Sequence, residues 1–303
     1  MTRVGAIDCG TNSIRLLVAD VDTGQKSDLH REMRVVRLGQ GVDATGSLSE
    51  DAVERTRVAL VDYADTCASL GVERVRMVAT SATRDASNRS AFVSMVERSL
   101  HVLPEVISGD EEAALSFRGA TADLLATPPF LVIDIGGGST EFVVGSDKVE
   151  AALSVDIGCV RLTERHLIGD PPTAEQVSRA RADIDLALSQ VRDAVPTSSA
   201  GTAVGLAGSV TTVAALVLGL AAYLPERIHH ARLQVVDVQR VAASLLAMTR
   251  AERAALPVMH PGRVDVIGAG ALILARTMER LELGGLVVSE SDILDGIALS
   301  MSS

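Results

Sequence analysis

The sequence predicts an α/β protein built from two related domains. Apolar, strand-like runs alternate with segments of helical periodicity along the chain. In addition, one hairpin pattern occurs twice: AIDCGTNSIRLLVAD begins at Ala6, and VIDIGGGSTEFVVGS begins at Val132. Each copy has an apolar strand, an aspartate, a glycine-containing turn, a hydroxyl residue and a second apolar strand. We therefore expect two duplicated α/β domains with a cleft between them.

The two copies align at Asp8 and Asp134. They differ seven residues later, where the first copy has Arg15 and the second has Glu141. Such a difference is expected of hairpins that diverged for function, although an ordinary strand residue would explain it equally well. The matched pairs are Ile7 and Ile133, Gly10 and Gly136, Ser13 and Ser139, and Val18 and Val144.

The remaining elements of the first domain follow in order. Residues 30–42 continue the first hairpin as a third strand and a loop. Residues 49–71 have helical periodicity and end in Gly71, a common helix stop. The others are a strand that runs into a polar loop (74–85), a helix (89–102), and a short strand followed at once by a helix (104–125).

The segment ATPPF at residues 126–130 interrupts this pattern just before the second hairpin. We therefore predict domains at 1–125 and 126–290, with the last helix (291–303) joining the first domain. After the second hairpin we expect the segment 157–167, a helix from Ala174 to Val195, a strand, turn and helix (203–219), two helices (238–248 and 263–281), a strand (284–290) and a final helix (292–301).

Composition limits the function. The chain has 303 residues, of which 47% are hydrophobic, and a net charge of −11. An acidic protein does not attract long nucleic acid, so arginines, backbone amides and a metal would have to hold any phosphate substrate. No apolar run approaches the roughly 20 residues that span a membrane, and the first residues enter a strand at once, without a secretory signal. Three widely spaced cysteines indicate reduced thiols and a cytoplasmic protein.

Both turns suit an anion. Glycines let the main chain approach closely, and consecutive N–H groups and hydroxyls can bind phosphate oxygens. A strand follows GGGST, so this is not a dinucleotide-binding fingerprint, and neither turn has the Lys-Ser/Thr of a Walker loop. Asp8 and Asp134 are hard oxygen ligands that, together with a phosphate, suit Mg²⁺. Tight turns capped by aspartate are the structural alternative.

Other polar residues leave two interpretations open. Ser108 and Glu111 have capping-box spacing at a helix start, whereas Glu112 needs another explanation, either catalysis or the helix dipole. Arg84 would clamp a phosphate or form a surface ion pair. Gly208 and Ser209 would form an anion-binding helix start or only a close strand–helix turn.

Six motifs occur in order along the chain: DCGTNSIRLLVAD, ATSATRDASN, ISGDEEAALSFRGA, VIDIGGGSTEFV, GLAGSVTT and SESDILDGIALS. Together they resemble the exopolyphosphatase / guanosine pentaphosphate phosphatase family, part of the superfamily of actin, sugar kinases and heat-shock ATPases. The combination of SGxEEA with DIGGGSTE is specific, whereas the first turn alone would indicate only the superfamily. The resemblance implies two ribonuclease-H-like (actin-like ATPase) domains.

The resemblance also implies roles. Glu112 corresponds to the family's catalytic base, Glu141 to an acid tied to activity, and Asp8 and Asp134 to acids that hold Mg²⁺, with Mn²⁺ as an alternative. The implied phosphate-binding residues are Arg84, Gly10, Thr11, Asn12, Ser13, Gly136, Gly137, Gly138, Ser139, Gly208 and Ser209.

The expected reaction is hydrolysis of the terminal phosphoanhydride of polyphosphate or guanosine pentaphosphate. Arg15, Arg161 and Arg263 are candidates for contacting the rest of the substrate. A phosphotransferase (kinase) of the same superfamily and a nucleotide-binding regulatory protein without turnover remain alternatives. Nucleic acid and membrane are not expected partners, and a homodimer fits general trends. The resemblance is to short members without additional C-terminal helical domains, for which processive action on very long polyphosphate is not expected.

Overall fold

A computed structural model describes residues 1–302. The chain folds into two compact units. The first comprises Met1–Ala122 together with the C-terminal residues from Asp292, and the second comprises Asp123–Ser291. No helix among the described residues is both long and apolar enough to span a membrane.

The first unit contains a five-stranded sheet and six helices among its described residues. Its strands are β1 (Thr2–Cys9), β2 (Ser13–Asp22), β3 (Gln25–Val35), β4 (Arg74–Ala79) and β5 (Glu105–Val106). Its helices are α1 (Val42–Thr45), α2 (Glu50–Ser69), α3 (Ser81–Asp85), α4 (Arg89–Leu100), α5 (Gly109–Thr121) and α13 (Ile293–Ser300).

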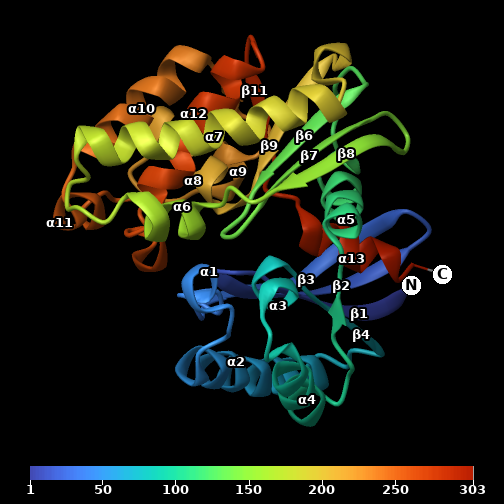
Figure 1. Ribbon diagram of the computed structural model, residues 1–303. Helices are drawn as coiled ribbons and strands as arrows, with labels where there is room; N and C mark the ends of the chain where they lie inside the picture. Colours follow the sequence, from blue (N-terminus) through green and yellow to red (C-terminus); the bar gives the residue numbers. More distant parts are fainter. Residues whose placement is uncertain (303) are drawn as a thin grey trace. The chain divides into compact units, whose positions relative to one another are not determined.

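The order of this sheet is β3-β2-β1-β4-β5, with β1, β4 and β5 parallel and β2 antiparallel to its neighbours. Alternate side chains face opposite cores, as the pleat requires. Ile7 and Met77 pack against α2 and α4, whereas Ala6 and Val78 pack against α5 and α13. Figure 1 shows α2 and α4 on one face of this sheet and α5 and α13 on the other. The last helix of the chain is therefore an integral layer of the first unit.

The second unit contains a six-stranded sheet. Its strands are β6 (Phe130–Ile135), β7 (Thr140–Gly145), β8 (Val149–Val155), β9 (Thr202–Leu206), β10 (Arg232–Leu233) and β11 (Leu286–Val288). Its helices are α6 (Cys159–His166), α7 (Ala174–Ala194), α8 (Ala207–Val217), α9 (Pro225–Ile228), α10 (Val235–Ala247), α11 (Arg250–Ala254) and α12 (Ile267–Arg280), with short 3₁₀ turns at Thr197–Ser199 and Pro261–Arg263.

The second sheet repeats the first. Its order, β8-β7-β6-β9-β11, matches β3-β2-β1-β4-β5, and β10 adds one antiparallel strand at the edge. This is the strand order of a ribonuclease-H-like domain, so the predicted fold class is confirmed, duplication included. Helices α6, α7, α8, α10 and α12 share one apolar core with Leu131, Ile133 and Phe142 of the sheet.

Two local predictions were wrong. The polar loop expected after the strand at 74–79 begins with helix α3, where the N–H groups of Thr83 and Arg84 donate to the carbonyl of Thr80. The helix expected from Arg263 starts only at Ile267, because residues up to Arg263 form a 3₁₀ turn. Both differences lie at helix starts, where periodicity says least about boundaries.

Candidate active-site residues

In the first unit, one edge of the sheet gathers three candidate residues. Strands β1, β4 and β5 are parallel, so their carboxyl ends lie together. Asp8 lies near the end of β1, Arg84 follows β4 on α3, and Glu112 follows β5 on α5. The structure therefore brings these three sequence-predicted residues to one edge of the first sheet.

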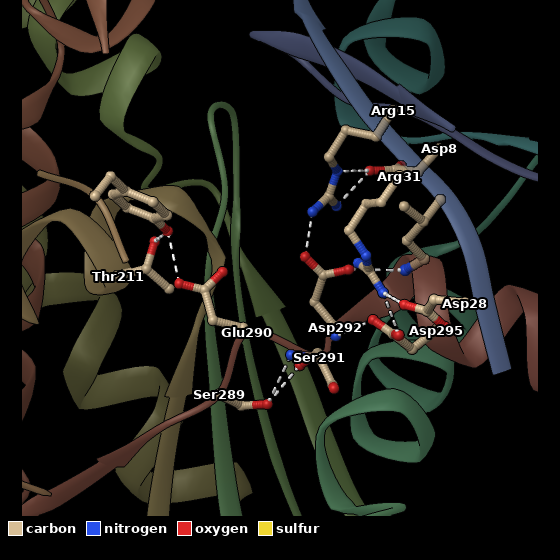
Figure 2. Close-up of polar contacts among 12 residues, drawn as sticks. Asp8, Arg15, Asp28, Arg31, Thr211, Ser289, Glu290, Ser291, Asp292 and Asp295 are labelled. Carbon is tan, nitrogen blue, oxygen red and sulfur yellow. Dashed lines mark hydrogen bonds and ion pairs between the residues drawn. The ribbon is translucent and has the colours of Figure 1, made fainter. Parts of the chain in front are cut away.

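Asp8 lies in a charge network that the sequence did not indicate (Figure 2). Arg15 is its partner in the antiparallel register of β1 and β2. The Asp8 Oδ2 atom accepts hydrogen bonds from Arg15 Nε at 3.1 Å and from Nη2 at 2.6 Å. The remaining nitrogen, Nη1, pairs with Asp292, the N-cap residue of α13. Arg15 thus joins Asp8 to the start of the last helix.

A second group of charges anchors the same helix (Figure 2). Asp295 is completely buried, and its carboxylate pairs with Lys26 Nζ at 2.8 Å and with Arg31 Nη2 at 2.5 Å. It also accepts the backbone N–H of Asp292, completing a capping box. Burial opposes ionisation, but the charges of Arg31 and Lys26 outweigh it, so the pKa of Asp295 lies below its ordinary value.

One carboxylate oxygen of Asp8 is available as a ligand for a cation. Its Oδ1 atom is buried and has no hydrogen-bond partner among the described residues. A buried carboxylate oxygen without a partner is costly, and a divalent cation is a ligand that such a hard oxygen accepts. Burial raises the pKa of Asp8 above its ordinary value, although Arg15 acts in the opposite direction. The residue therefore fits the metal-binding role predicted for it.

Glu112 is buried in the first turn of α5 and is held by an arginine. Arg84 Nη1 donates to Glu112 Oε2 at 3.1 Å and to the carbonyl of Ile107 at 2.9 Å. Only Nη1 takes part in these two bonds, so the Nε and Nη2 groups remain to contact another acceptor. Arg84 therefore does more than form an ordinary surface ion pair, because it holds the Glu112 carboxylate in place.

The neighbouring Glu111 has a structural role. Its backbone N–H donates to the Ser108 hydroxyl at 3.2 Å, which is the N-cap contact that the sequence predicted. Its carboxylate accepts from Arg76 Nη2 at 3.0 Å and is largely exposed. The two adjacent glutamates therefore differ in environment, one exposed and paired to a strand, the other buried beside Arg84.

The first turn directs part of its backbone away from the protein interior. The carbonyl of Thr11 accepts the N–H of Gly39, and the carbonyl of Asn12 accepts the N–H groups of Val36 and Arg37. In a trans peptide the N–H points opposite to the C=O, so the amides that follow these two carbonyls face away from residues 36–39. The Thr11 hydroxyl is shared with Ser81 at 2.8 Å.

In the second turn, three carbonyls rather than two are held by hydrogen bonds. The carbonyls of Gly136, Gly137 and Gly138 all bond to the first residues of α6, through the N–H groups of Cys159 and Val160 and through Arg161 Nε. The amides of residues 137–139 therefore face away from α6, a concave arrangement that suits an anion. Nothing in the sequence analysis indicated that α6 orients this turn.

In both hairpins the first glycine closes the turn itself. The N–H of Gly10 donates to the carbonyl of Ser13, and that of Gly136 to the carbonyl of Ser139, each at 3.0 Å. The amides of Gly10 and Gly136 are engaged in these equivalent bonds. Any backbone N–H that binds a phosphate in either turn must therefore come from a residue after the first glycine.

In the second unit, β6, β9 and β11 are parallel and also end at one edge. Asp134 and Glu141 are direct neighbours across β6 and β7, and both are buried. Glu141 Oε1 accepts from the Ser154 hydroxyl at 2.7 Å. The equivalent register pair in the first unit is Asp8 with Arg15, so one hairpin carries an acid–base pair and the other two acids.

Gly208 and Ser209 lie at the same edge, at the start of α8. A Cβ atom on Gly208 would lie 2.2 Å from Arg263 Nη2, so only glycine lets the guanidinium lie against this turn. Arg263 Nη1 also donates to the Thr212 hydroxyl at 3.2 Å. A helix N-terminus beside a guanidinium suits an anionic group.

Further along this edge, a tyrosine joins two elements. The Tyr223 hydroxyl bonds to the Thr211 hydroxyl and to Glu290 Oε1, both at 2.7 Å. Figure 2 shows Thr211 and Glu290 beside each other, with Ser289 and Ser291 next in the chain. Thr211 and Glu290 lie in the motifs GLAGSVTT and SESDILDGIALS, but the sequence analysis assigned neither of them a role.

A histidine pair in the second unit resembles a metal site by proximity alone. Asp123 approaches His229 Nε2 at 3.3 Å and His230 Nε2 at 3.8 Å. However, the N–H of Glu290 donates to His229 Nδ1 at 3.1 Å, so the neutral ring carries its proton on Nε2, facing Asp123. The group is better described as a hydrogen-bonded network.

A duplicated ribonuclease-H-like fold with acids and glycine turns at its strand ends suits the binding of phosphate groups. The chain matches the Ppx/GppA phosphatase family over residues 17–303, and it belongs to this family. It is therefore a phosphohydrolase, and the resemblance that the motifs indicated is confirmed. Phosphatases of this family generally depend on a divalent metal.

The names of individual relatives agree with this family. The chain is 54% identical to Exopolyphosphatase 2 of Mycobacterium tuberculosis, over 100% of this chain and 99% of that protein. It is 30% identical to a guanosine-5'-triphosphate,3'-diphosphate pyrophosphatase of Vibrio atlanticus, over 98% of this chain but only 58% of that protein.

Solved structures are also similar. A Ppx/GppA family member from Aquifex aeolicus has a TM-score of 0.83 and 34% identity, covering 99% of this chain and 97% of that one. An exopolyphosphatase from Cytophaga hutchinsonii has a TM-score of 0.91 and 27% identity, covering 100% and 99%.

Proposed function

We propose that this chain releases the terminal phosphate of inorganic polyphosphate, of guanosine pentaphosphate or of both. One observation carries the mechanism: Glu112 is a buried carboxylate at the start of α5, held in place by Arg84. The relatives named for exopolyphosphatase and guanosine pentaphosphate activity support the two substrates. Three buried free cysteines are in keeping with a cytoplasmic location.

Each residue has a role in the proposed reaction. Glu112 orients and deprotonates the attacking water, while Arg84 fixes this carboxylate and presents Nε and Nη2 to a phosphate oxygen. Phosphoryl transfer needs mainly positioning and charge stabilisation, which arginine and backbone amides supply.

The phosphate-binding residues fall into two groups. Gly10 and Gly136 shape the turns, because their amides are engaged within them. The amides of Asn12, Ser13, Gly137, Gly138 and Ser139, the hydroxyl of Thr11, and the helix start at Gly208 and Ser209 would contact phosphate oxygens.

Asp8 of the first unit and Asp134 of the second are the carboxylates that would bind Mg²⁺ or Mn²⁺, and Glu141 beside Asp134 adds a second acid at its sheet edge. When bound, the cation would neutralise charge on the transferred phosphate. The unpartnered Oδ1 atom of Asp8 is the feature of the chain that supports this assignment.

The test is metal-dependent phosphate release from short polyphosphate, long polyphosphate, guanosine pentaphosphate and ATP. Glu112→Gln should lower kcat by about 10²- to 10⁴-fold while substrate still binds. Glu111→Gln is the matched control, because this neighbouring glutamate pairs with Arg76 and should leave kcat nearly unchanged. Equal loss in both variants would contradict the assignment of the base.

Comparison of substrates then decides between polyphosphate and guanosine pentaphosphate. Release from none of the four by the folded protein would refute the proposal. Product formation that requires an added acceptor would favour the phosphotransferase alternative, and tight nucleotide binding without turnover would favour the regulatory one.

A further inference from the structure

The second unit has a cavity of about 490 Å³ that none of the candidate residues line. It lies between the start of β9, strand β10 and the segment that links α12 to β11. A smaller cavity of about 260 Å³ adjoins it, and the two share Thr197, Ser198, Leu281 and Glu282. We call the pair the amino-edge cavity.

The amino-edge cavity is separate from the candidate active-site residues of its unit. Thr202 and Leu286, which line it, are the first residues of the parallel strands β9 and β11. Gly208 and Ser209 follow the other end of β9, after five strand residues. At about 3.3 Å per residue, the first and last residues of β9 lie about 13 Å apart.

The cavity is basic although the chain is acidic. Arg232 lines the larger part, and Arg192 and Arg280 line the smaller, with Glu282 as the only carboxylate among the residues that line it. Three arginines and one glutamate leave an excess of two positive charges, in a chain with a net charge of −11.

These arginines have spare hydrogen-bonding capacity. The side chains of Arg192 and Arg232 form no ion pair or hydrogen bond with the residues that the structure describes. Arg280 Nε is buried without a hydrogen-bond partner in residues 1–302, and its nearest carboxylate oxygen, Asp185 Oδ1, is 3.9 Å away. A buried guanidinium N–H without an acceptor is costly, so an incoming oxygen ligand would relieve it.

The backbone between α12 and β11 has an unusual conformation beside the cavity. Glu282 follows α12 with φ +54°, a left-handed conformation in which glycine is favoured after a helix. Gly284, two residues after Glu282, borders open space, so the main chain is accessible to a ligand at this point. Non-glycine residues held in this region of φ and ψ concentrate at ligand sites.

We propose that the amino-edge cavity binds a multivalent phosphate anion. Guanidinium groups match phosphate oxygens in geometry and charge, and a volume of about 490 Å³ exceeds what a single phosphate needs. The shared chemistry is a chain of linked phosphates, either inorganic or on a nucleotide. The proposal does not rest on the proposed hydrolysis, because it concerns a different edge of the sheet.

The experiment follows backbone amide NMR signals of the ¹⁵N-labelled full chain while sodium tripolyphosphate is added. EDTA is present, so that metal-dependent hydrolysis does not interfere. Saturable shifts of Gly284 and Gly285 report the amino-edge cavity, whereas those of Gly137 and Gly138 report the glycine turn. The two sites are thereby read separately in one titration, and the failure of one does not affect the other.

Variants test the charges. Arg232→Ala and Arg192→Ala should each weaken binding at Gly284 about fivefold or more, because each removes a charge-assisted contact. Glu282→Gln should strengthen it, because a repelling carboxylate is lost. Arg227→Ala is the control, since this exposed arginine of α9 lies in the same unit but lines neither cavity, and it should leave binding unchanged.

Tighter binding of tripolyphosphate than of ATP would identify an inorganic phosphate chain as the ligand. Tighter binding of ATP would identify a nucleotide. The proposal is overturned if the signals of Gly284 and Gly285 do not move at millimolar tripolyphosphate. It is also overturned if Arg227→Ala weakens binding as much as Arg232→Ala, because the effect would then be general surface charge.

Discussion

The packing of α5 against α13 should tolerate no side chain at Gly119. A Cβ atom there would lie 1.8 Å from the carbonyl oxygen of Asp292 and 2.9 Å from the N–H nitrogen of Gly296. These neighbours are backbone atoms, so no rotamer change can make room. Gly119→Ala must therefore move one helix away from the other by about 1 Å, which on a dispersion potential forfeits roughly a quarter to a half of each contact.

The cost follows from what α13 buries. Ile293, Leu294, Ile297 and Met301 pack into the apolar core on this face of the first sheet. Fully buried, each of these four side chains is worth about 1.5–3 kcal/mol, so losing a quarter to a half of their contacts costs about 1.5–6 kcal/mol. Alanine recovers up to about 1 kcal/mol through its better helix propensity. We expect Gly119→Ala to reduce the free energy of unfolding by about 1–5 kcal/mol.

The assay is urea unfolding followed by circular dichroism, with hydrogen exchange measured on peptides from α5 and α13. Exchange should accelerate in these helices and not in α7 or α12, which belong to the other unit. Gly268→Ala in α12 is the matched control, because its new Cβ would meet Leu246 Cδ2 at 3.4 Å and Arg253 Nη1 at 4.0 Å, both ordinary contacts with side-chain atoms. If Gly119→Ala is as stable as the unsubstituted chain, the close helix contact is not what fixes α13.

Three further predictions concern the charges and thiols. Arg15→Lys should lower the free energy of unfolding in urea by about 1–3 kcal/mol, because one ammonium group cannot replace the three nitrogens that bond to Asp8 and Asp292. An unchanged urea midpoint of unfolding would contradict this. The pKa of Asp295 is lowered in the folded chain, so the stability that its carboxylate contributes should be complete above about pH 4 and be lost as pH falls through the folded-state pKa. Asp295→Asn should therefore reduce the dependence of the free energy of unfolding on pH in this acidic range. An unchanged pH dependence in the variant would contradict the lowered pKa. Burial raises the pKa of Cys67 to about 11, so this thiol should react with a disulfide reagent only after unfolding, and rapid reaction in the folded chain would refute its burial.

Much of the fold was predictable because its signals are local. Short apolar runs and glycine turns define each hairpin within about 15 residues, and the repetition of Asp8 at Asp134 revealed the duplication. The strand order then followed from the fold class. The start of α3 was missed because the bonds that form it, from Thr83 and Arg84 to Thr80, involve residue types that are equally common in loops.

The candidate site was predictable residue by residue but not in its connections. The sequence pointed to Glu112 and Arg84 separately, and only the fold made them hydrogen-bond partners across 28 positions. Asp292 lies in the motif SESDILDGIALS but received no role of its own, because a helix-capping aspartate is common.

The amino-acid sequence by itself determined the repeated hairpins, their glycine turns and the acids at their strand ends, because each depends on neighbouring residues and on the two-residue period of a strand. Only the tertiary structure decided that α6 turns the amides of the second hairpin outward and that Arg15 joins Asp8 to Asp292, 277 positions away. Such contacts depend on which surfaces meet after folding. A single arginine or aspartate carries no sign of its distant partner.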